Sequence, residues 1–279
     1  GYVYILNNGS NFVLENLVIN GFTCNKPIFE DKVTCEKTKS TEITDENEGI
    51  ICGDGNTEDY DNLTECYIKS IADYKEFTDL VNSGKNFSGK TVYLTKNLDL
   101  NGVSLETIGN DNNKFEGTFE GNGYTLKNIK IESSNDYVGI FGYNTGMIRG
   151  TNFENITIKG NNYVGGIVGF NEGNISSIMF SGNVTGNENI GGITGQHNSG
   201  NNYYSPGTIE NVIVKNIVVN GNKNVGGVVG LAYKGTLKSV VENGSINTGG
   251  CIYATWTYGI SGNSACSNSV QLDEVVDSR

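Results

Sequence analysis

A twelve-residue stretch from Asp54 to Glu65 carries oxygen-bearing side chains at the spacing of a calcium-binding loop. The side chains at positions 1, 3, 5 and 12 of the stretch are Asp54, Asn56, Glu58 and Glu65. An EF-hand loop uses ligands at these positions to surround Ca²⁺, but it also needs a glycine at position 6, where this chain has Asp59. Two interpretations stay open: a calcium site, or an acidic solvated loop closed by a disulfide. No other cofactor is expected.

The six cysteines all lie in the two flanks of the chain. They are Cys24, Cys35, Cys52, Cys66, Cys251 and Cys266. With no CxxC pair and one histidine, structural zinc is disfavoured, and disulfides formed in an oxidising compartment are expected. Among the fifteen possible pairings we favour local closure: Cys24 with Cys35, Cys52 with Cys66, and Cys251 with Cys266.

Residues suited to catalysis are sparse, and we assign none as catalytic. His197 is the single histidine, so a zinc peptidase motif is absent, and its polar surroundings predict a solvated loop residue. Paired carboxylates could cleave polysaccharides. The candidates are spread one or two per repeat and are expected to form a solvated face: Glu154, Glu172, Glu188, Glu210 and Glu242. A polysaccharide lyase or hydrolase therefore remains the alternative to a non-enzyme.

The net charge of −12 argues against nucleic acid and anionic membranes as partners. Residues 23–66 hold twelve acidic and four basic side chains, so much of the acidity belongs to one segment. No run approaches the roughly 20 apolar residues that span a bilayer. The chain begins at Gly1 without Met, which suggests a mature or excised piece.

Glycine-framed segments recur in the second half of the chain and would position any functional side chain. They begin at Val138, Val164, Ile190 and Val225, for example Val164-Gly165-Gly166-Ile167-Val168-Gly169. The first two intervals are 26 residues, and the third is 35 because residues 198–206 add a polar loop. Such a period indicates a stack of repeated units, and the many glycines and β-branched residues favour an all-β protein.

A second pattern inside the repeats is an Asn or Ser followed by apolar, any and apolar residues. It occurs at Asn128, Asn155, Ser177, Asn211 and Ser239. In parallel rungs about 4.8 Å apart, such side chains can hydrogen-bond along the stack and satisfy buried turn backbone. We therefore predict a structural ladder.

Other segments should close or decorate the stack. Residues 70–84 predict a helix that starts at Ser70 with Asp73 as a capping partner and covers the N-terminal end of the stack. Loop and terminal aromatic residues could form a binding surface. They are Tyr203, Tyr204, Tyr253, Trp256 and Tyr258.

The glycine-framed segments resemble the GLUG repeat of bacterial surface proteins. The stretches that approach them, 71–77, 87–100 and 115–126, are also similar, although Glu120 stands where the family usually has Asp. The resemblance covers about residues 68–250. It implies a right-handed parallel β-helix, as found in extracellular adhesins, fibrous surface proteins and the non-catalytic region of IgA-cleaving metallopeptidases.

These observations predict an N-terminal strand segment (1–22), a disulfide-stapled acidic insertion (23–67), a β-helix (68–250) and a C-terminal cap and tail (251–279). We expect a non-catalytic structural or adhesive module, located outside the cell at its surface. Residues 10–21 resemble an internal rung at 151–160, so residues 1–22 could complete a neighbouring molecule and build a head-to-tail filament. Packing in the same chain is the alternative. A host protein or glycan is a further expected partner, and a spacer in a secreted protease is another possible role.

Overall fold

The computed structural model describes residues 14–19, 22–26, 34–37, 60, 63–198, 207–233, 236–247, 251–256 and 270–272. Their contacts divide the chain into two compact units, Gly1–Asn47 and Glu48–Arg279. Side chains are described for residues 60, 63–198, 207–232 and 237.

The first unit contains a small antiparallel sheet of three strands. The strands are β1 (Leu14–Ile19), β2 (Phe22–Lys26) and β3 (Thr34–Lys37), in the order β1-β2-β3. β1 is paired with β2 of the same chain, and Cys24 faces Cys35 directly across β2 and β3.

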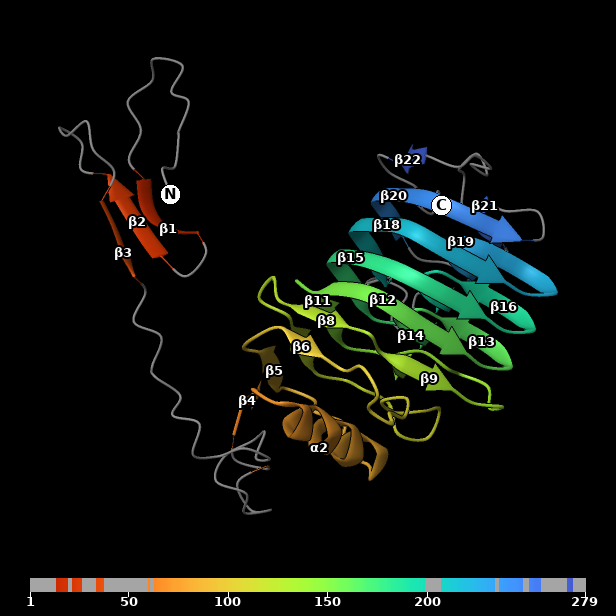
Figure 1. Cartoon of the computed structure of the whole chain (residues 1–279), viewed down its shortest axis with the longest axis horizontal. Coiled ribbons are helices and arrows are strands. Elements are labelled where there is room, and N and C mark those ends of the chain that lie inside the picture. Colours follow the sequence, from red (N-terminus) through yellow and green to blue (C-terminus); the bar gives the residue numbers. More distant parts are fainter. Residues whose placement is uncertain are drawn as a thin grey trace. The chain divides into compact units, whose positions relative to one another are not determined.

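In its described residues, the second unit is a parallel β-solenoid of about five turns that carries a helix (Figure 1). Its first part contains β4 (Glu65–Ile68), α2 (Ile71–Asn82), β5 (Thr91–Leu94), β6 (Leu98–Asp99), β7 (Thr118–Glu120), β8 (Thr125–Lys127) and β9 (Lys130–Glu132). The middle contains β10 (Phe141–Asn144), β11 (Met147–Arg149), β12 (Asn152–Lys159), β13 (Asn162–Gly165), β14 (Val168–Asn171), β15 (Asn174–Thr185), β16 (Glu188–Gly191) and β17 (Thr194–Asn198). The last part contains β18 (Thr208–Asn220), β19 (Lys223–Tyr233), β20 (Thr236–Asn247), β21 (Cys251–Trp256) and β22 (Val270–Leu272).

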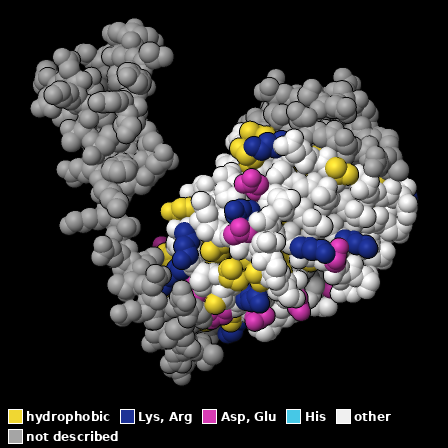
Figure 2. Space-filling view, in the orientation of Figure 1, with side chains coloured by type: hydrophobic (Ala, Val, Ile, Leu, Met, Phe, Trp, Pro, Cys, Tyr) yellow, Lys and Arg dark blue, Asp and Glu magenta, His cyan; other side chains and the backbone are white. Residues whose placement is uncertain are grey.

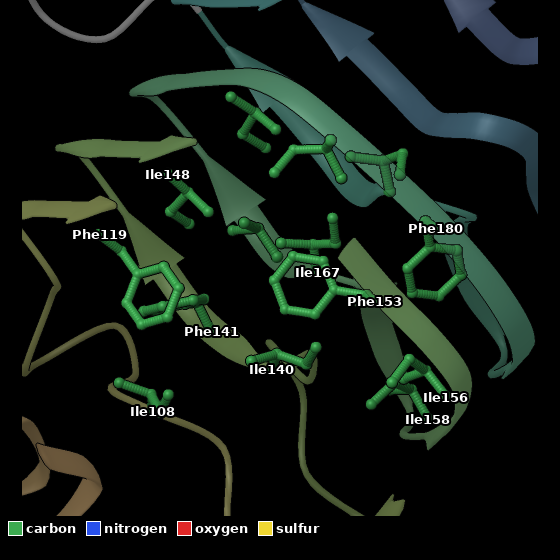
Figure 3. Close-up of a cluster of buried hydrophobic side chains, with 14 of the residues drawn as sticks. Ile108, Phe119, Ile140, Phe141, Ile148, Phe153, Ile156, Ile158, Ile167 and Phe180 are labelled. Atoms are coloured by element: carbon green, nitrogen blue, oxygen red, sulfur yellow. The ribbon is translucent and has the colours of Figure 1, made fainter. Parts of the chain in front are cut away.

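Side chains of the same position stack on one another in successive turns. One inward column consists of Phe119, Ile148, Ile175, Ile209 and Leu237, each the register partner of the next. Alternating apolar residues in each strand produce this column, because successive side chains of a strand point to opposite faces. The resulting core is shown in Figure 3, where Phe119, Phe141 and Phe153 pack among isoleucines from several turns.

Helix α2 lies at one end of this unit, beside the first strands (Figure 1). The Ser70 hydroxyl caps it by accepting a hydrogen bond from the Asp73 amide, as the sequence predicts. Its Phe77 ring contacts four core rings, including those of Phe87 and Phe115 at centroid distances of 5.1 and 5.6 Å. The predicted cap at the N-terminal end of the stack is therefore present. Within the described residues, no helix is long and apolar enough to cross a membrane.

The glycine-framed segments form parts of the rungs. They need glycine because the backbones of neighbouring rungs lie too close together for a side chain. A Cβ on Gly166 would lie 2.2 Å from the carbonyl oxygen of Gly192 in the next rung. A Cβ on Gly169 would lie 2.6 Å from the carbonyl carbon of Tyr137 in the rung below. The glycine spacing thus records where one turn of backbone packs on the next.

The predicted acidic insertion ends, and the predicted β-helix begins, within strand β4. Cys66 lies in this strand, fully buried and disulfide-bonded. Cys52 and Cys266 lie outside the described residues, so the three pairings remain predictions. At the other end, β21 continues the stack by pairing in parallel with β19, and β22 pairs antiparallel with β20.

Candidate functional site

The residues predicted to form one ladder are distributed over two columns of the solenoid. Asn155 Nδ2 donates to Asn128 Oδ1 at 2.6 Å, and Asn128 Nδ2 donates to Asp99 Oδ1 at 2.6 Å. Ser177 aligns instead with Asn211 and Ser239, because their neighbours Ser176, Glu210 and Lys238 are register partners. The Asn128–Asn155 bond lies at the surface, so it does not satisfy the buried backbone that the sequence pattern suggested.

A left-handed backbone conformation explains why the pattern occurs in both columns. Asn155, Ser177 and Asn211 have φ values of 54°, 54° and 53°, and Asn216, five residues beyond Asn211, has a φ of 50°. Asn tolerates this conformation better than most residues. Two such positions about five residues apart produce the same local sequence pattern, and only the pairing of rungs distinguishes them.

A second ladder is buried in the unit and contains the only histidine of the chain. Asn144 Nδ2 donates to Asn171 Oδ1 at 2.7 Å, and Asn171 Nδ2 lies 3.0 Å from His197 Nδ1. His197 Nε2 lies 3.1 Å from the carbonyl oxygen of Gly207. Donation by Asn171 to Nδ1 leaves Nε2 to carry the proton and donate to Gly207, so the imidazole is neutral.

His197 is therefore not the solvated loop residue that its polar neighbours predict; it is 1% exposed. Burial lowers its pKa to about 4, since charging the ring would require desolvating a cation. In the rungs below, Asn144 and Asn171 reach the carbonyls of Gly146 and Gly173, two residues ahead. Because the polar insertion follows Asn198, the glycine equivalent to Gly173 is Gly207. The imidazole of His197 is longer than an Asn side chain and reaches the carbonyl oxygen of Gly207.

A third ladder follows the solvent-exposed turn beside the glycine-framed strands. Asn187 Nδ2 donates to Asn162 Oδ1 at 3.1 Å, and Asn222 Nδ2 donates to Asn187 Oδ1 at 2.9 Å. At the lower end Asp136 Oδ1 accepts from Asn161 Nδ2 at 2.8 Å and from the Asn162 amide at 3.0 Å. Side-chain hydrogen bonds thus join successive rungs on several faces of the stack.

Surface charges also pair between neighbouring strands and rungs. Lys127 Nζ lies 3.1 Å from Asp99 Oδ2, and the Arg149 guanidinium contacts the Glu120 carboxylate. On the face in Figure 2, Lys and Arg side chains are accordingly interspersed with Asp and Glu. The Glu120 side chain is longer than that of the Asp usual at this position in GLUG repeats. Its Oε2 accepts from Arg149 Nε, and its Oε1 accepts from the Asn122 amide.

Four partly buried aromatic rings form a cluster on the lower two glycine-framed rungs. We call Tyr137, Tyr143, Tyr163 and Phe170 the aromatic cluster. Tyr137 and Tyr163 stack at a centroid distance of 4.9 Å, and Tyr143 and Phe170 stack at 4.7 Å. Lys114 Nζ lies 4.0 Å from the Tyr143 ring centroid. Burial and a hydrogen bond with Glu172 raise the pKa of Tyr143.

The sequence contains a signal for this cluster that residue-by-residue inspection missed. Tyr137 and Tyr163 are 26 residues apart, which is the repeat interval, and Tyr143 and Phe170 are 27 apart. Aromatic residues separated by one period stack on neighbouring rungs. In the next two rungs the Tyr137 position holds Asn189 and Asn224.

A recess with a cavity volume of about 380 Å³ adjoins the aromatic cluster at Tyr137. It lies between the 105–110 segment and the 131–138 segment, and its charged lining residues are Glu106, Glu132 and Asp136. No Lys or Arg lines it among the residues that the structure describes. Burial, followed by the charges of Tyr163, Asp111 and Asp136, raises the pKa of Tyr137.

The other candidate site residues are only partly within the described structure. Asp54, Asn56 and Glu58 lie outside it, and Glu65 is an exposed residue whose carboxylate accepts from the Tyr67 hydroxyl at 2.6 Å. That hydrogen bond, with burial, raises the pKa of Tyr67 to about 12. In the described part of the chain, no group of three or more His, Cys, Asp or Glu could hold a metal ion.

The aromatic residues predicted as a binding surface lie mostly outside the described part. Tyr203, Tyr204 and Tyr258 are not described. Tyr253 and Trp256 belong to β21, where only the backbone is described. The structure therefore does not test that surface, whereas it brings together the four rings of the aromatic cluster.

Residues 160–185 match the GLUG motif, and this segment lies within the parallel β-solenoid. The match begins at Gly160, includes β13 and β14, and ends with the last residue of β15, so it contains one turn of the stack. No curated protein and no solved structure matches the chain. The chain is thus a β-helix repeat module with a GLUG motif, a repeat of a non-catalytic type.

Proposed function

We propose that the chain is a non-catalytic structural module of an extracellular surface protein, in which the stacked rungs serve as a stiff shaft. The observation that carries this proposal is the set of side-chain ladders that join successive rungs. Among them, Asn144, Asn171 and His197 form a continuous hydrogen-bonded series inside the stack. A column of this kind contributes cohesion along the stack axis, the property that a shaft requires.

The GLUG motif and the capped solenoid also support a structural role. Helix α2 packs against the first rungs at one end of the stack, as expected of a cap. The ladders use polar side chains for contacts between rungs. Cleavage of a polysaccharide would instead need a pair of carboxylates placed on either side of the glycosidic bond.

The proposed role extends to adhesion and to head-to-tail assembly into filaments. The N-terminal strand β1 has a sequence resembling an internal rung, which supports exchange between molecules. Its pairing with β2 in the same chain engages one of its edges, and no other described strand pairs with its second edge, where such a contact would form.

Electron microscopy of the purified chain tests assembly. We expect filaments from the intact chain, loss of filaments on deleting residues 1–22, and retention on deleting only residues 1–13, which spares β1. Filaments that survive deletion of residues 1–22 would contradict strand exchange.

Incubation with a panel of polysaccharides tests the non-catalytic role. The expected result is no increase in reducing or unsaturated ends over a heat-denatured sample. Reproducible release of either product would replace the structural proposal with an enzymatic one.

A further inference from the structure

The aromatic cluster is unexpected on structural grounds, because two of its rings occupy strained backbone positions. Tyr137 and Tyr163 have φ values of 58° and 54°, in the left-handed region that bulky residues rarely adopt. The same column holds Asn189 and Asn224 in the next two rungs, where Asn224 Nδ2 donates to Asn189 Oδ1 at 2.7 Å. Asn therefore fits the position with less strain than Tyr and also forms a ladder. Tyr at the two lower positions needs a different reason, and strain of this kind concentrates at binding sites.

The recess beside Tyr137 has the charge of a cation-binding site. Its lining carries Glu106, Glu132 and Asp136, with no Lys or Arg among the described lining residues. Glu132 has a partner in Lys130 at 3.1 Å, but both side chains are about half exposed, so a ligand can displace that ion pair. Asp136 accepts hydrogen bonds from Asn161 Nδ2 and the Asn162 amide through Oδ1, and no described residue donates to its Oδ2, which can therefore accept from a ligand.

The adjoining rings favour the same kind of ligand. Lys114 Nζ already lies 4.0 Å from the centroid of the Tyr143 ring, so one ammonium group is bound to the aromatic cluster within the chain. Tyr137 belongs both to the cluster and to the wall of the recess. A cation entering the recess would therefore meet carboxylates and an aromatic ring together.

We propose that this recess binds a guanidinium or ammonium group presented by a basic peptide segment of a partner protein. A bare metal ion does not fit, because no group of three or more acidic, His or Cys side chains in the described residues is compact enough to hold one. A neutral sugar would displace water from three carboxylates without compensating their charge. A basic side chain supplies both the charge and the hydrogen-bond donors. This inference is independent of the shaft role, which survives if the recess binds nothing.

Fluorescence anisotropy with a labelled arginine-rich peptide tests the proposal on the full chain. The matched probe has citrulline in place of each arginine, which removes the charge and keeps the shape. We expect binding of the arginine peptide that weakens with added salt, and at least about tenfold weaker binding of the citrulline peptide.

Two variants locate the binding. Glu106→Gln with Asp136→Asn removes two charges from the recess, and Tyr137→Asn installs the residue that the upper rungs carry, so both should fold. Each should weaken peptide binding at least about tenfold. The control, Glu154→Gln with Glu210→Gln, removes the same charge from two other columns and should bind like the unmodified chain.

Circular dichroism and the melting temperature establish that each variant is folded. Equal loss of binding in the recess and control variants would mean that net charge alone attracts the peptide, and the proposal would be wrong. Absence of binding to the arginine peptide, or a neutral oligosaccharide bound in its place, would also overturn it.

Discussion

His197 occupies a position that asparagine holds in the two rungs below it, and its burial has a consequence for pH dependence. Its pKa is lowered to about 4 by burial, from about 6.5 in an unfolded chain. As the pH falls below about 6.5, the unfolded chain therefore binds a proton that the folded chain does not. Stability is fully present above that pH and is lost progressively down to about pH 4.

The loss of stability caused by His197 can be separated from the effects of other titrating groups with a variant that keeps a hydrogen-bonding side chain at this position. Between about pH 7 and pH 5, the free energy of unfolding should fall by about 2 kcal/mol more in the unmodified chain than in His197→Asn. Urea unfolding at both pH values measures the difference. Identical pH dependence in the two proteins would mean that His197 is not a buried neutral residue.

Gly169 is the residue at which close approach between rungs is tested most simply. A Cβ there would lie 2.6 Å from the Tyr137 carbonyl carbon and 2.8 Å from the Gly142 carbonyl oxygen, both backbone atoms. Gly169→Ala should therefore cost about 1–3 kcal/mol or more. The measurement is thermal unfolding of the variant.

The control for Gly169 is Gly102, which has a φ of 73° and open space around the position of a Cβ. Gly102→Ala should cost only the left-handed conformation, about 1 kcal/mol. A Gly169→Ala variant as stable as the Gly102→Ala variant would show that the rungs are not this closely packed.

Among the elements, helix α2 packs on the first rungs through several buried side chains, of which Phe77 is central. Phe77 is fully buried and contacts the rings of Phe87, Phe115, Phe119 and Phe141. Phe77→Ala should lower the free energy of unfolding by about 3–5 kcal/mol, because it leaves a cavity where helix and rungs meet.

Lys75, an exposed residue on the same helix, provides the comparison. Lys75→Ala should change stability by less than about 0.5 kcal/mol. If both variants unfold at the same urea concentration, the helix does not contribute to the core as the structure indicates.

The elements could be predicted where the signal is local. The capping box at Ser70 and the apolar alternation of the strands depend on neighbouring residues, and the 26-residue interval repeats without a gap between Val138 and Ile190. Column membership could not be predicted in the same way. Ser177 and Asn155 share a local pattern but lie in different columns, because rung pairing decides the register.

The site was less predictable than the fold for a related reason. A polar neighbourhood in sequence suggested an exposed His197, whereas the structure places it in β17, where its imidazole contacts the carbonyl oxygen of Gly207. The aromatic cluster joins residues about one repeat apart, so it can be recognised in the sequence only by comparing equivalent positions of successive repeats. The recess depends on two segments about 25 residues apart along the chain.

Across the second unit as a whole, the glycine-rich segments are hydrogen-bonded rungs of the stack and not flexible linkers. The Ile167 amide donates to the Ile193 carbonyl at 3.0 Å, and the Ile193 amide donates to the Val228 carbonyl at 2.9 Å. These bonds pass from rung to rung through the centres of the glycine-framed segments, and both isoleucines are fully buried. Continuity of the shaft depends on them.

Residue-resolved hydrogen exchange tests this claim most directly. The Ile167 and Ile193 amides should exchange at least about a hundredfold more slowly, relative to their unstructured rates, than the Asn112 amide, which bonds only the Asn110 side chain in an exposed turn. Equally slow exchange in both segments is the result expected of one continuous stack. Exchange of Ile167 and Ile193 as fast as that of Asn112 would contradict the account, because the glycine-rich segments would then be linkers between separate strands.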